Sequence, residues 1–256
     1  MNNIITTYKI IYHQLVDYTT SNSKTLISII SGFLLVLIIR SLLAIMDTLF
    51  IQEEFPIQRI VFMLSTSLLI MGLEIGYTKF IFEIIDHKER KLGFIFSHFD
   101  ILGKYVSGLF FYYLILIVIS LPILIYTYIK YGIEIFNIFS SALLDPYFQE
   151  LATSYFDFKE LLYISILFSI PVIYIMIRIF FWSYFIIDKE LSGINAIQKS
   201  WQLTKNRNYE ILFFGIFLLL INIIGALTII GICLTLPLSY LFVCLYFRFL
   251  ISKNHK

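Results

Sequence analysis

Only two charged residues, Glu210 and Arg248, interrupt the stretch from 209 to 251. As a single helix this stretch would be roughly 60 Å long, which is twice the hydrocarbon thickness of a bilayer. It therefore predicts two membrane-spanning helices with a turn near residues 225–231. The whole chain has the same character, because charged residues make up 14% of it, whereas a soluble domain averages about 25%. This composition excludes a soluble enzyme, a disordered chain and a small disulfide-stapled domain.

Further apolar stretches extend the pattern along the chain, and about 20 residues are enough for one span. The sequence predicts an all-α fold, a polytopic transmembrane helical bundle with six spans. The predicted spans cover residues 25–46, 60–82, 105–129, 161–187, 209–226 and 231–251, within a membrane domain over residues 25–251. Acidic residues rather than a cleavage site follow the first stretch, so it is predicted to be retained. Residues 1–24 are predicted to form an amphipathic helix on the membrane surface, and residues 252–256 a basic tail.

Basic residues divide unevenly between the two sides of the predicted bundle. If the N-terminus lies in the cytoplasm, thirteen of the 19 Lys and Arg residues fall on the cytoplasmic side and three on the other. The cytoplasmic set is Lys9, Lys24, Lys88, Arg90, Lys91, Lys104, Lys189, Lys199, Lys205, Arg207, Arg248, Lys253 and Lys256. Lysine and arginine favour cytoplasmic loops. The sequence therefore predicts a multi-pass protein of the plasma membrane with both termini in the cytoplasm.

Both long cytoplasmic connections are predicted to be amphipathic interfacial helices. The apolar stripe of the first consists of Leu92, Ile95, Phe99 and Leu102. The stripe of the second, which Ser192 could cap, consists of Ile194, Ile197, Trp201 and Thr204. Each helix would bury its stripe in the headgroup layer or against the bundle and present its bases to the cytoplasmic leaflet. A structural elbow between spans is the favoured interpretation, and contact of the cytoplasmic basic residues with anionic lipid would be incidental to it.

The second connection also carries a sequence signature that continues into the last span. Its members are Asp188, Leu191, Ala196, Ser200, Trp201, Leu203, Thr204 and Lys205, with Pro237 and Arg248 further along. The signature resembles that of a broad group of bacterial integral membrane proteins of uncharacterised function, which includes the membrane domain found fused to glycerophosphodiester phosphodiesterases. The resemblance covers mainly residues 185–250 and implies a six-span bundle. Asn206 stands where the group commonly has glycine, and asparagine could take the same left-handed turn.

Charged side chains within the predicted spans are candidates for function, because a charge at the centre of a span is costly. At 1.5 Å per residue, Glu74 in the second span and Arg178 in the fourth lie within roughly 5 Å of the same depth. They are predicted to form an intramembrane ion pair. A structural pair, or Arg178 extending alone to the inner headgroups, is favoured over a transport site. The same rise places Arg40 nearer Asp47 than Glu74.

Other residues in the spans allow pairing or kinking. Lys79 and Glu83, four residues apart, are predicted to pair and to extend toward the inner face. Pro122, Pro171 and Pro237 interrupt three spans toward their predicted outer ends, where kinks could open a crevice. Ordinary kinks without a cavity are the favoured interpretation.

Catalytic signatures are missing from the sequence. It contains no His-Glu-x-x-His, no Gly-x-Ser-x-Gly and no Gly-rich phosphate loop. We therefore expect no enzyme activity, no metal site and no cofactor, and a net charge of +2 gives no reason to expect nucleic acid. The 256 residues include no phosphodiesterase catalytic domain, so the resemblance does not imply that activity. Membrane lipids are the expected partners.

Two functions fit these observations. The favoured one is a structural or accessory membrane component, because the spans contain few polar residues that could line a transport path. The alternative is a transporter or lipid-handling protein that uses a Glu74/Arg178 polar site and an outer-leaflet crevice.

Overall fold

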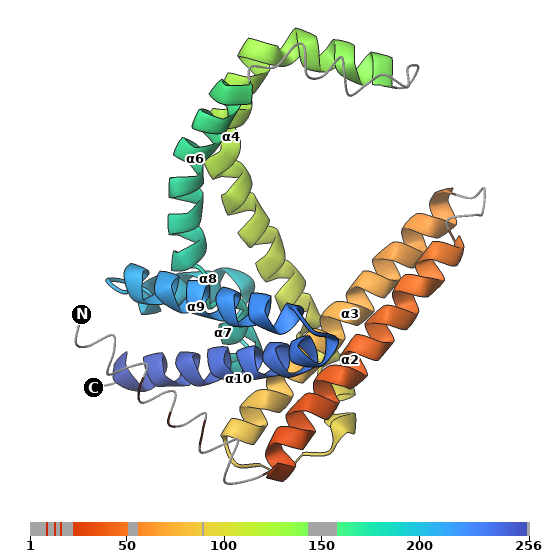
Figure 1. The fold of residues 1–256 in the computed structure, drawn as a ribbon, viewed down its shortest axis with the longest axis vertical. Coiled ribbons are helices and arrows are strands. Elements are labelled where there is room, and N and C mark those ends of the chain that lie inside the picture. The colour runs from red at the N-terminus through yellow and green to blue at the C-terminus, as the bar shows by residue number, and fades with distance from the viewer. Residues whose placement is uncertain are drawn as a thin grey trace. The chain divides into compact units, whose positions relative to one another are not determined.

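The computed structural model describes residues 23–50, 56–88, 90–142 and 158–254, together with Lys9, His13 and Val16. These residues form helices and turns, and no strand occurs among them. Six of the helices are long and apolar enough to cross a membrane (Figure 1). The all-α fold with six spans, predicted from the sequence, is thereby confirmed. The predicted surface helix over residues 1–24 and the end of the C-terminal tail lie almost entirely outside the described residues.

The chain divides into two compact units. The first comprises Met1–Leu109 and Ile179–Lys256, and the second comprises Phe110–Arg178. The first unit holds α2 (Ser23–Phe50), α3 (Pro56–Ile85), η1 (Leu92–Ser97), η2 (Phe99–Ile101), α7 (Trp182–Lys189), α8 (Gly193–Leu203), α9 (Asn208–Ala226) and α10 (Ile229–Asn254). The second unit holds α6 (Phe158–Arg178) and most of α4 (Leu102–Ala142), whose first residues belong to the first unit.

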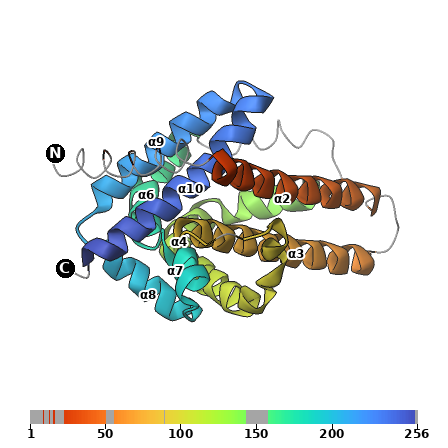
Figure 2. The ribbon, with the colours of Figure 1, turned by 90° about the horizontal axis from the view of Figure 1, so that it is seen from below.

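Two helical hairpins organise the first unit, and the members of each, α2 with α3 and α9 with α10, lie side by side (Figure 1, Figure 2). The second hairpin turns at residues 227–228, as the long apolar stretch predicted. Its helices approach closely because Gly225 has no side chain: a Cβ there would lie 2.2 Å from Thr235 Oγ1. Asn222 adds a polar contact, since its Nδ2 donates to Ser239 Oγ at 3.0 Å.

The fourth predicted span, residues 161–187, consists of two helices rather than one. A short turn separates α6 from α7, which begins at Trp182. In this turn the Trp182 N–H donates to the Ile179 carbonyl oxygen at 3.2 Å. The Phe181 N–H donates to Ser200 Oγ of α8 at 3.0 Å. Hydropathy could not predict the break, because the hydroxyl that satisfies this buried N–H comes from another helix.

The first predicted amphipathic helix, over residues 92–102, is wrong in type. These residues form the 3-10 helices η1 and η2 and the first residue of α4. Ile95 and Ile101 are buried, whereas Leu92 and Phe99 of the predicted stripe are exposed. The 3₁₀ geometry turns every third residue to one side and thus replaces the α-helical stripe.

Glycines in α3 explain why this segment lies so close to the hairpin. A Cβ on Gly76 would lie 1.8 Å from the carbonyl oxygen of Ile95 in η1. A Cβ on Gly72 would lie 2.1 Å from the ring of Phe99 in η2. The backbone of η1 therefore rests directly on the backbone of α3, at a distance that only glycine permits.

The second amphipathic helix is present as α8, but its buried face differs from the predicted stripe. The buried residues are Gly193, Ala196, Ile197, Ser200, Leu203 and Thr204. Ile197 and Thr204 of the predicted stripe are buried, whereas Ile194 and Trp201 are 46% and 40% exposed. Small residues are buried because α8 lies close to α4: a Cβ on Gly193 would be 2.5 Å from the Gly108 nitrogen. Ser192 is the residue before α8, and its side chain makes no capping hydrogen bond.

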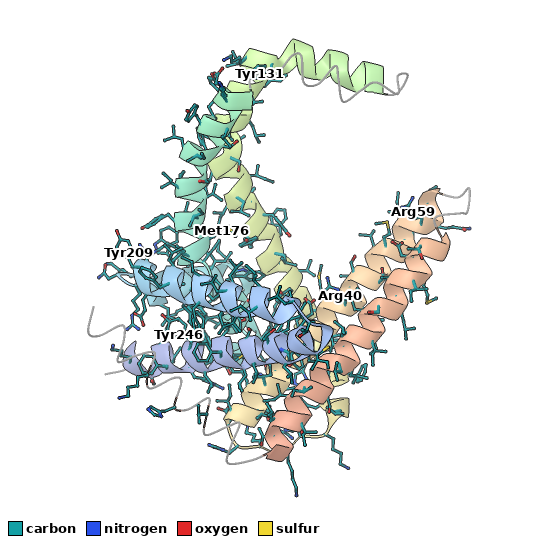
Figure 3. All side chains as sticks on the ribbon, in the orientation of Figure 1. Arg40, Arg59, Tyr131, Met176, Tyr209 and Tyr246 are labelled. Atoms are coloured by element: carbon teal, nitrogen blue, oxygen red, sulfur yellow. The ribbon has the colours of Figure 1, made fainter. Side chains whose placement is uncertain are left out.

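In the second unit, Glu160 joins the first turn of α6 to α4. Its carboxylate accepts hydrogen bonds from Lys130 and Tyr126, and Tyr131 Oη donates to it at 3.4 Å. Tyr131 lies where α4 changes direction (Figure 3). The hydrogen bonds from Lys130 and Tyr126 hold the pKa of the Glu160 carboxyl below its ordinary value.

The three prolines predicted to kink spans each lie inside a continuous helix. Pro122 is in α4, Pro171 in α6 and Pro237 in α10. The first two belong to the second unit and Pro237 to the first. The predicted outer crevice combines residues of both units and stays a prediction.

Candidate functional site

Arg248 of α10 joins three helices through two carboxylates. Its Nη1 donates to Asp188 Oδ2 at 2.9 Å, and its Nη2 lies 2.8 Å from Asp188 Oδ1. Nη2 also donates to Asp86 Oδ2 at 2.8 Å. Asp86 directly follows α3, and Asp188 lies in the last turn of α7. We call Asp86, Asp188 and Arg248 the carboxylate junction.

The carboxylate junction rests on buried aromatic rings. The Arg248 guanidinium carbon lies 5.0 Å from the centroid of the Phe82 ring, which is a cation–π distance. Phe82 contacts Phe247 at a centroid distance of 5.8 Å, and Phe247 contacts Phe185 at 5.0 Å. The side chains of Asp188 and Arg248 are only 6% and 24% exposed. In such surroundings the removal of one partner leaves the other charge poorly solvated.

Lys79 and Glu83, predicted to pair with each other, have other partners. Lys79 Nζ donates to the Ile187 carbonyl oxygen of α7 at 3.0 Å. Glu83 accepts hydrogen bonds from Lys88 at 3.1 Å and from Arg90 at 2.9 and 2.8 Å. The predicted Lys79–Glu83 pair is therefore wrong. Lys79 is held by the distant helix α7, whereas Glu83 is held by two bases in the segment that follows α3.

Glu190 follows α7 in a left-handed conformation, with φ 52°. Non-glycine residues seldom adopt this conformation, and it needs support from the surroundings. The carboxylate lies 3.7 Å from Lys79 Nζ and 3.8 Å from Lys104 Nζ. Asn206, beyond α8, has φ 64°, which confirms the left-handed turn predicted for it.

A second arginine site lies within the α2–α3 hairpin, where Arg40 Nη1 donates to Glu74 Oε1 at 3.1 Å. The prediction that Arg40 lies nearer Asp47 than Glu74 is wrong. Long side chains on a helix lean toward its N-terminus, and α2 and α3 run in opposite directions (Figure 1). The side chains of Arg40 and Glu74 therefore lean toward each other, and they meet although their Cα atoms lie at different depths. The two side chains are 62% and 38% exposed.

Arg178, the predicted partner of Glu74, is the last residue of α6 and is buried. It belongs to the second unit, whereas Glu74 belongs to the first. The Glu74–Arg178 ion pair therefore stays a prediction. Glu74 already holds one arginine, Arg40.

The signature residues cluster on α7, α8 and α10. The buried members are Ala196, Ser200, Leu203, Thr204 and Pro237. The half-buried members are Asp188, Leu191 and Arg248, and the exposed ones are Trp201 and Lys205. Within α8, Thr204 Oγ1 donates to the Ser200 carbonyl oxygen at 2.9 Å, while Ser200 Oγ accepts the Phe181 N–H. The signature therefore marks residues that fasten α8 and α7 to the rest of the first unit.

Sequence reasoning missed the carboxylate junction. The signal that could have found it is the signature itself, since it contains both Asp188 and Arg248 at the same predicted end of their spans. Asp86 carries no comparable signal, because it follows a span among other polar residues. Only the tertiary structure brings it to 2.8 Å from Arg248.

Within the described ranges, no group of three or more His, Cys, Asp or Glu side chains could hold a metal ion. The carboxylates of Asp86, Asp188 and Glu83 are engaged by arginine or lysine. These carboxylates join helices, and most of their oxygen atoms are already paired with a basic side chain rather than available to a ligand. No protein-family model, curated protein or solved structure matches the chain.

Proposed function

We propose that this multi-pass membrane protein is a structural or accessory component of the plasma membrane, without catalysis, and with both termini in the cytoplasm. The observation that carries this proposal is the carboxylate junction. A transporter or enzyme needs polar groups that stay available to its substrate. Here Arg248, Asp86 and Asp188 are used on one another, and they tie α3, α7 and α10 together.

A deletion strain tests the accessory role. We expect loss of the protein to lower the abundance of specific other membrane proteins, measured by quantitative proteomics of isolated membranes. The wild-type gene and a Gly215→Ala variant should restore that abundance, because Gly215 has open space around it. An unchanged membrane proteome, accompanied by a changed distribution of a solute or lipid, would contradict the proposal.

Cysteine labelling tests the orientation. Gln58 lies in the first turn of α3 and Lys199 lies on α8, and both side chains are exposed. In a background where Cys233 and Cys244 are replaced by alanine, we expect a membrane-impermeant maleimide to label Gln58→Cys in intact cells. Lys199→Cys should react only after permeabilisation. The reverse pattern would invert the proposed topology.

Transport or lipid handling is the second candidate, and the exposed Arg40–Glu74 pair favours it. A polar pair on the surface of a hydrophobic hairpin could meet a polar substrate. Deletion would then alter a transported solute or lipid, and the neutral double variant Arg40→Gln/Glu74→Gln would reproduce the deletion. Gly215→Ala, whose new Cβ meets nothing within 4 Å, should not do so.

Two residues of the signature that resembles the bacterial membrane group have a structural role in this chain. Asp188 and Ser200 are both used to hold the first unit together. We also propose that two exposed bases, Lys199 on α8 and Lys205 in the turn after it, contact anionic lipids. Neutralising both bases should weaken the enrichment of anionic lipid around the full-length protein in nanodiscs of mixed composition, and unchanged enrichment would contradict this contact.

A further inference from the structure

The Arg40–Glu74 pair lies far from both ends of the hairpin helices. In the span Lys24–Thr48, Arg40 is about 24 Å from the start and about 12 Å from the end along the helix. In the span Ile57–Ile85, Glu74 is about 26 Å from the start and about 17 Å from the end. Both charges therefore belong to the hydrocarbon layer, where charged groups persist only with polar partners.

The pair has more hydrogen-bonding capacity than it uses. A guanidinium has five N–H donors, and one hydrogen bond from Arg40 Nη1 to Glu74 is found among the described residues. The side chains are 62% and 38% exposed, so the chain leaves much of their surface uncovered. Lipid chains offer their polar atoms no hydrogen bond. Another polar surface has to cover the pair.

We propose that a second copy of this chain covers it, in a two-fold symmetric dimer formed by the α2–α3 hairpins. Two copies inserted in the same direction are related by an axis along the membrane normal, which keeps every atom at its own depth. The charged ends of Arg40 and Glu74 lie 3.1 Å apart and hence at nearly one depth. Arg40 of each copy can therefore meet Glu74 of the other.

Charge balance favours a second copy over an anionic amphiphile. The Arg40–Glu74 pair is neutral, so a phosphate or carboxylate bound to Arg40 would leave a net negative charge beside Glu74 in a medium of low dielectric. A second pair adds no net charge and supplies one acceptor and one donor. The resulting four-charge ring is neutral and reciprocally hydrogen-bonded.

Small exposed residues share the face of the pair. Ala44 lies four residues after Arg40 on α2, and Ser67 lies seven residues before Glu74 on α3. These intervals place them on the same helix faces as the two charges. Small residues let membrane helices approach closely, as an interhelical ion pair requires.

Charge reversal in mixed populations tests the dimer. Full-length Arg40→Glu and Glu74→Arg variants, each labelled at the C-terminus with donor or acceptor fluorophores, are reconstituted in liposomes and measured by energy transfer. Each variant alone should associate about tenfold more weakly than the wild type. A mixture of the two variants should recover association, because the carboxylates of the first variant then face the guanidinium groups of the second across the interface.

That recovery distinguishes a dimer from a merely intramolecular pair, since both variants still carry like charges within each chain. A mixture that associates no better than the single variants overturns the proposal, as does a wild type that stays monomeric across lipid dilution. Folding of each variant is verified by a single symmetric peak in detergent. If a reversal does not fold, the neutral Arg40→Gln variant replaces it and must still weaken association.

Cysteine cross-linking supplies an independent test that leaves the charges intact. Ala44→Cys on the proposed interface should cross-link to its counterpart, whereas Ile38→Cys, which is exposed on the opposite side of α2, should not. Equal cross-linking at both positions would indicate random collision and count against the dimer.

Discussion

Two arginines meet α3 in opposite surroundings. At the end of the helix, Arg248 holds Asp86 and the mostly buried Asp188 with three contacts of 2.8 to 2.9 Å. Within the helix, Glu74 receives one hydrogen bond from Arg40, and both side chains are largely or partly exposed. The difference lies mainly in the arginines, because Arg248 is 24% exposed where it meets Asp188, whereas Arg40 is 62% exposed on the α2–α3 hairpin.

The difference indicates that ion pairs in a membrane protein can have two roles, stabilising the fold or promoting association. The enclosed site pairs Arg248 with two carboxylates, although its Nε has no hydrogen-bond partner among the described residues, and the first unit depends on this pairing for stability. The open site satisfies only part of its hydrogen-bonding capacity and so has reason to associate. Substitutions at the two arginines should therefore separate folding from association.

The largest effect is expected for Arg248→Ala. It leaves Asp188, whose side chain is 6% exposed, with Lys189 Nζ at 3.1 Å but without its arginine, so we expect a cost near the lower end of the roughly 3–5 kcal/mol typical of a broken buried pair. We expect a large fall in the thermal unfolding temperature of the purified protein in detergent. Arg40→Ala is the matched control, because it removes an arginine from an exposed pair and should lower that temperature much less.

Equal losses of stability at the two arginines would break the comparison. Arg248→Lys refines it, since lysine keeps the charge but cannot bind Asp188 with two nitrogen atoms. Its stability should fall between those of the wild type and Arg248→Ala. If Arg248→Lys is as stable as the wild type, the contact of two guanidinium nitrogen atoms with Asp188 does not contribute to stability.

The sequence allowed the architecture to be predicted but only a small part of the two arginine sites. Long runs without charge predicted the spans, and the excess length of residues 209–251 predicted the α9–α10 turn, because both follow from the thickness of a bilayer. The left-handed turn at Asn206 followed from residue type and the resemblance. These are local properties, and a single sequence reveals them.

The missed features depend on contacts between distant segments. The break before α7 needs the hydroxyl of Ser200, and η1 needs the bare backbone of Gly76. Helix rise places the Cα atoms of Arg40 and Glu74 at different depths. The pair forms because the side chains lean toward each other by several ångströms, which Cα depths omit. The partnership of Arg248 with Asp86 spans 162 residues, and no sequence spacing encodes it.

Gly76→Ala sharpens the comparison by disturbing the enclosed part of α3 without touching a charge. The new Cβ would lie 1.8 Å from the Ile95 carbonyl oxygen, so η1 must move away. We expect a destabilisation of about 3 kcal/mol, at the upper end of overpacking effects. Gly215→Ala, in α9 with open space around it, is the control and should be neutral or slightly stabilising.

Thermal unfolding in detergent measures both glycine variants. If Gly76→Ala is as stable as Gly215→Ala, the close contact of η1 with α3 is not a determinant of the fold. Association by energy transfer should be preserved in Gly76→Ala where it remains folded, since the variant leaves Arg40 and Glu74 in place.

Ser200→Ala should have a smaller effect on the enclosed side. It removes the acceptor of the buried Phe181 N–H and leaves that donor unsatisfied, which costs about 1–2 kcal/mol. Ser192→Ala is the matched control, because the Ser192 side chain is exposed and makes no capping bond. Hydrogen exchange in the turn before α7 should accelerate in Ser200→Ala alone, and similar exchange in both variants would contradict the role of Ser200.

The smallest effect extends the comparison to Glu160, a half-buried carboxylate in the second unit. Hydrogen bonds from Lys130 and Tyr126 lower its pKa below 4.5 in the folded protein. A carboxyl with a lowered folded pKa stabilises the fold above its unfolded pKa, and this contribution disappears as the pH falls through the folded value. Spin labels at Ile129 and Leu162, both exposed, should therefore keep the same separation at neutral pH and move apart only when the pH falls through the lowered pKa of folded Glu160. In Glu160→Gln the separation should not depend on pH over this range. A wild type whose label distance stays constant down to about pH 2 would show that Glu160 does not hold α4 and α6 together.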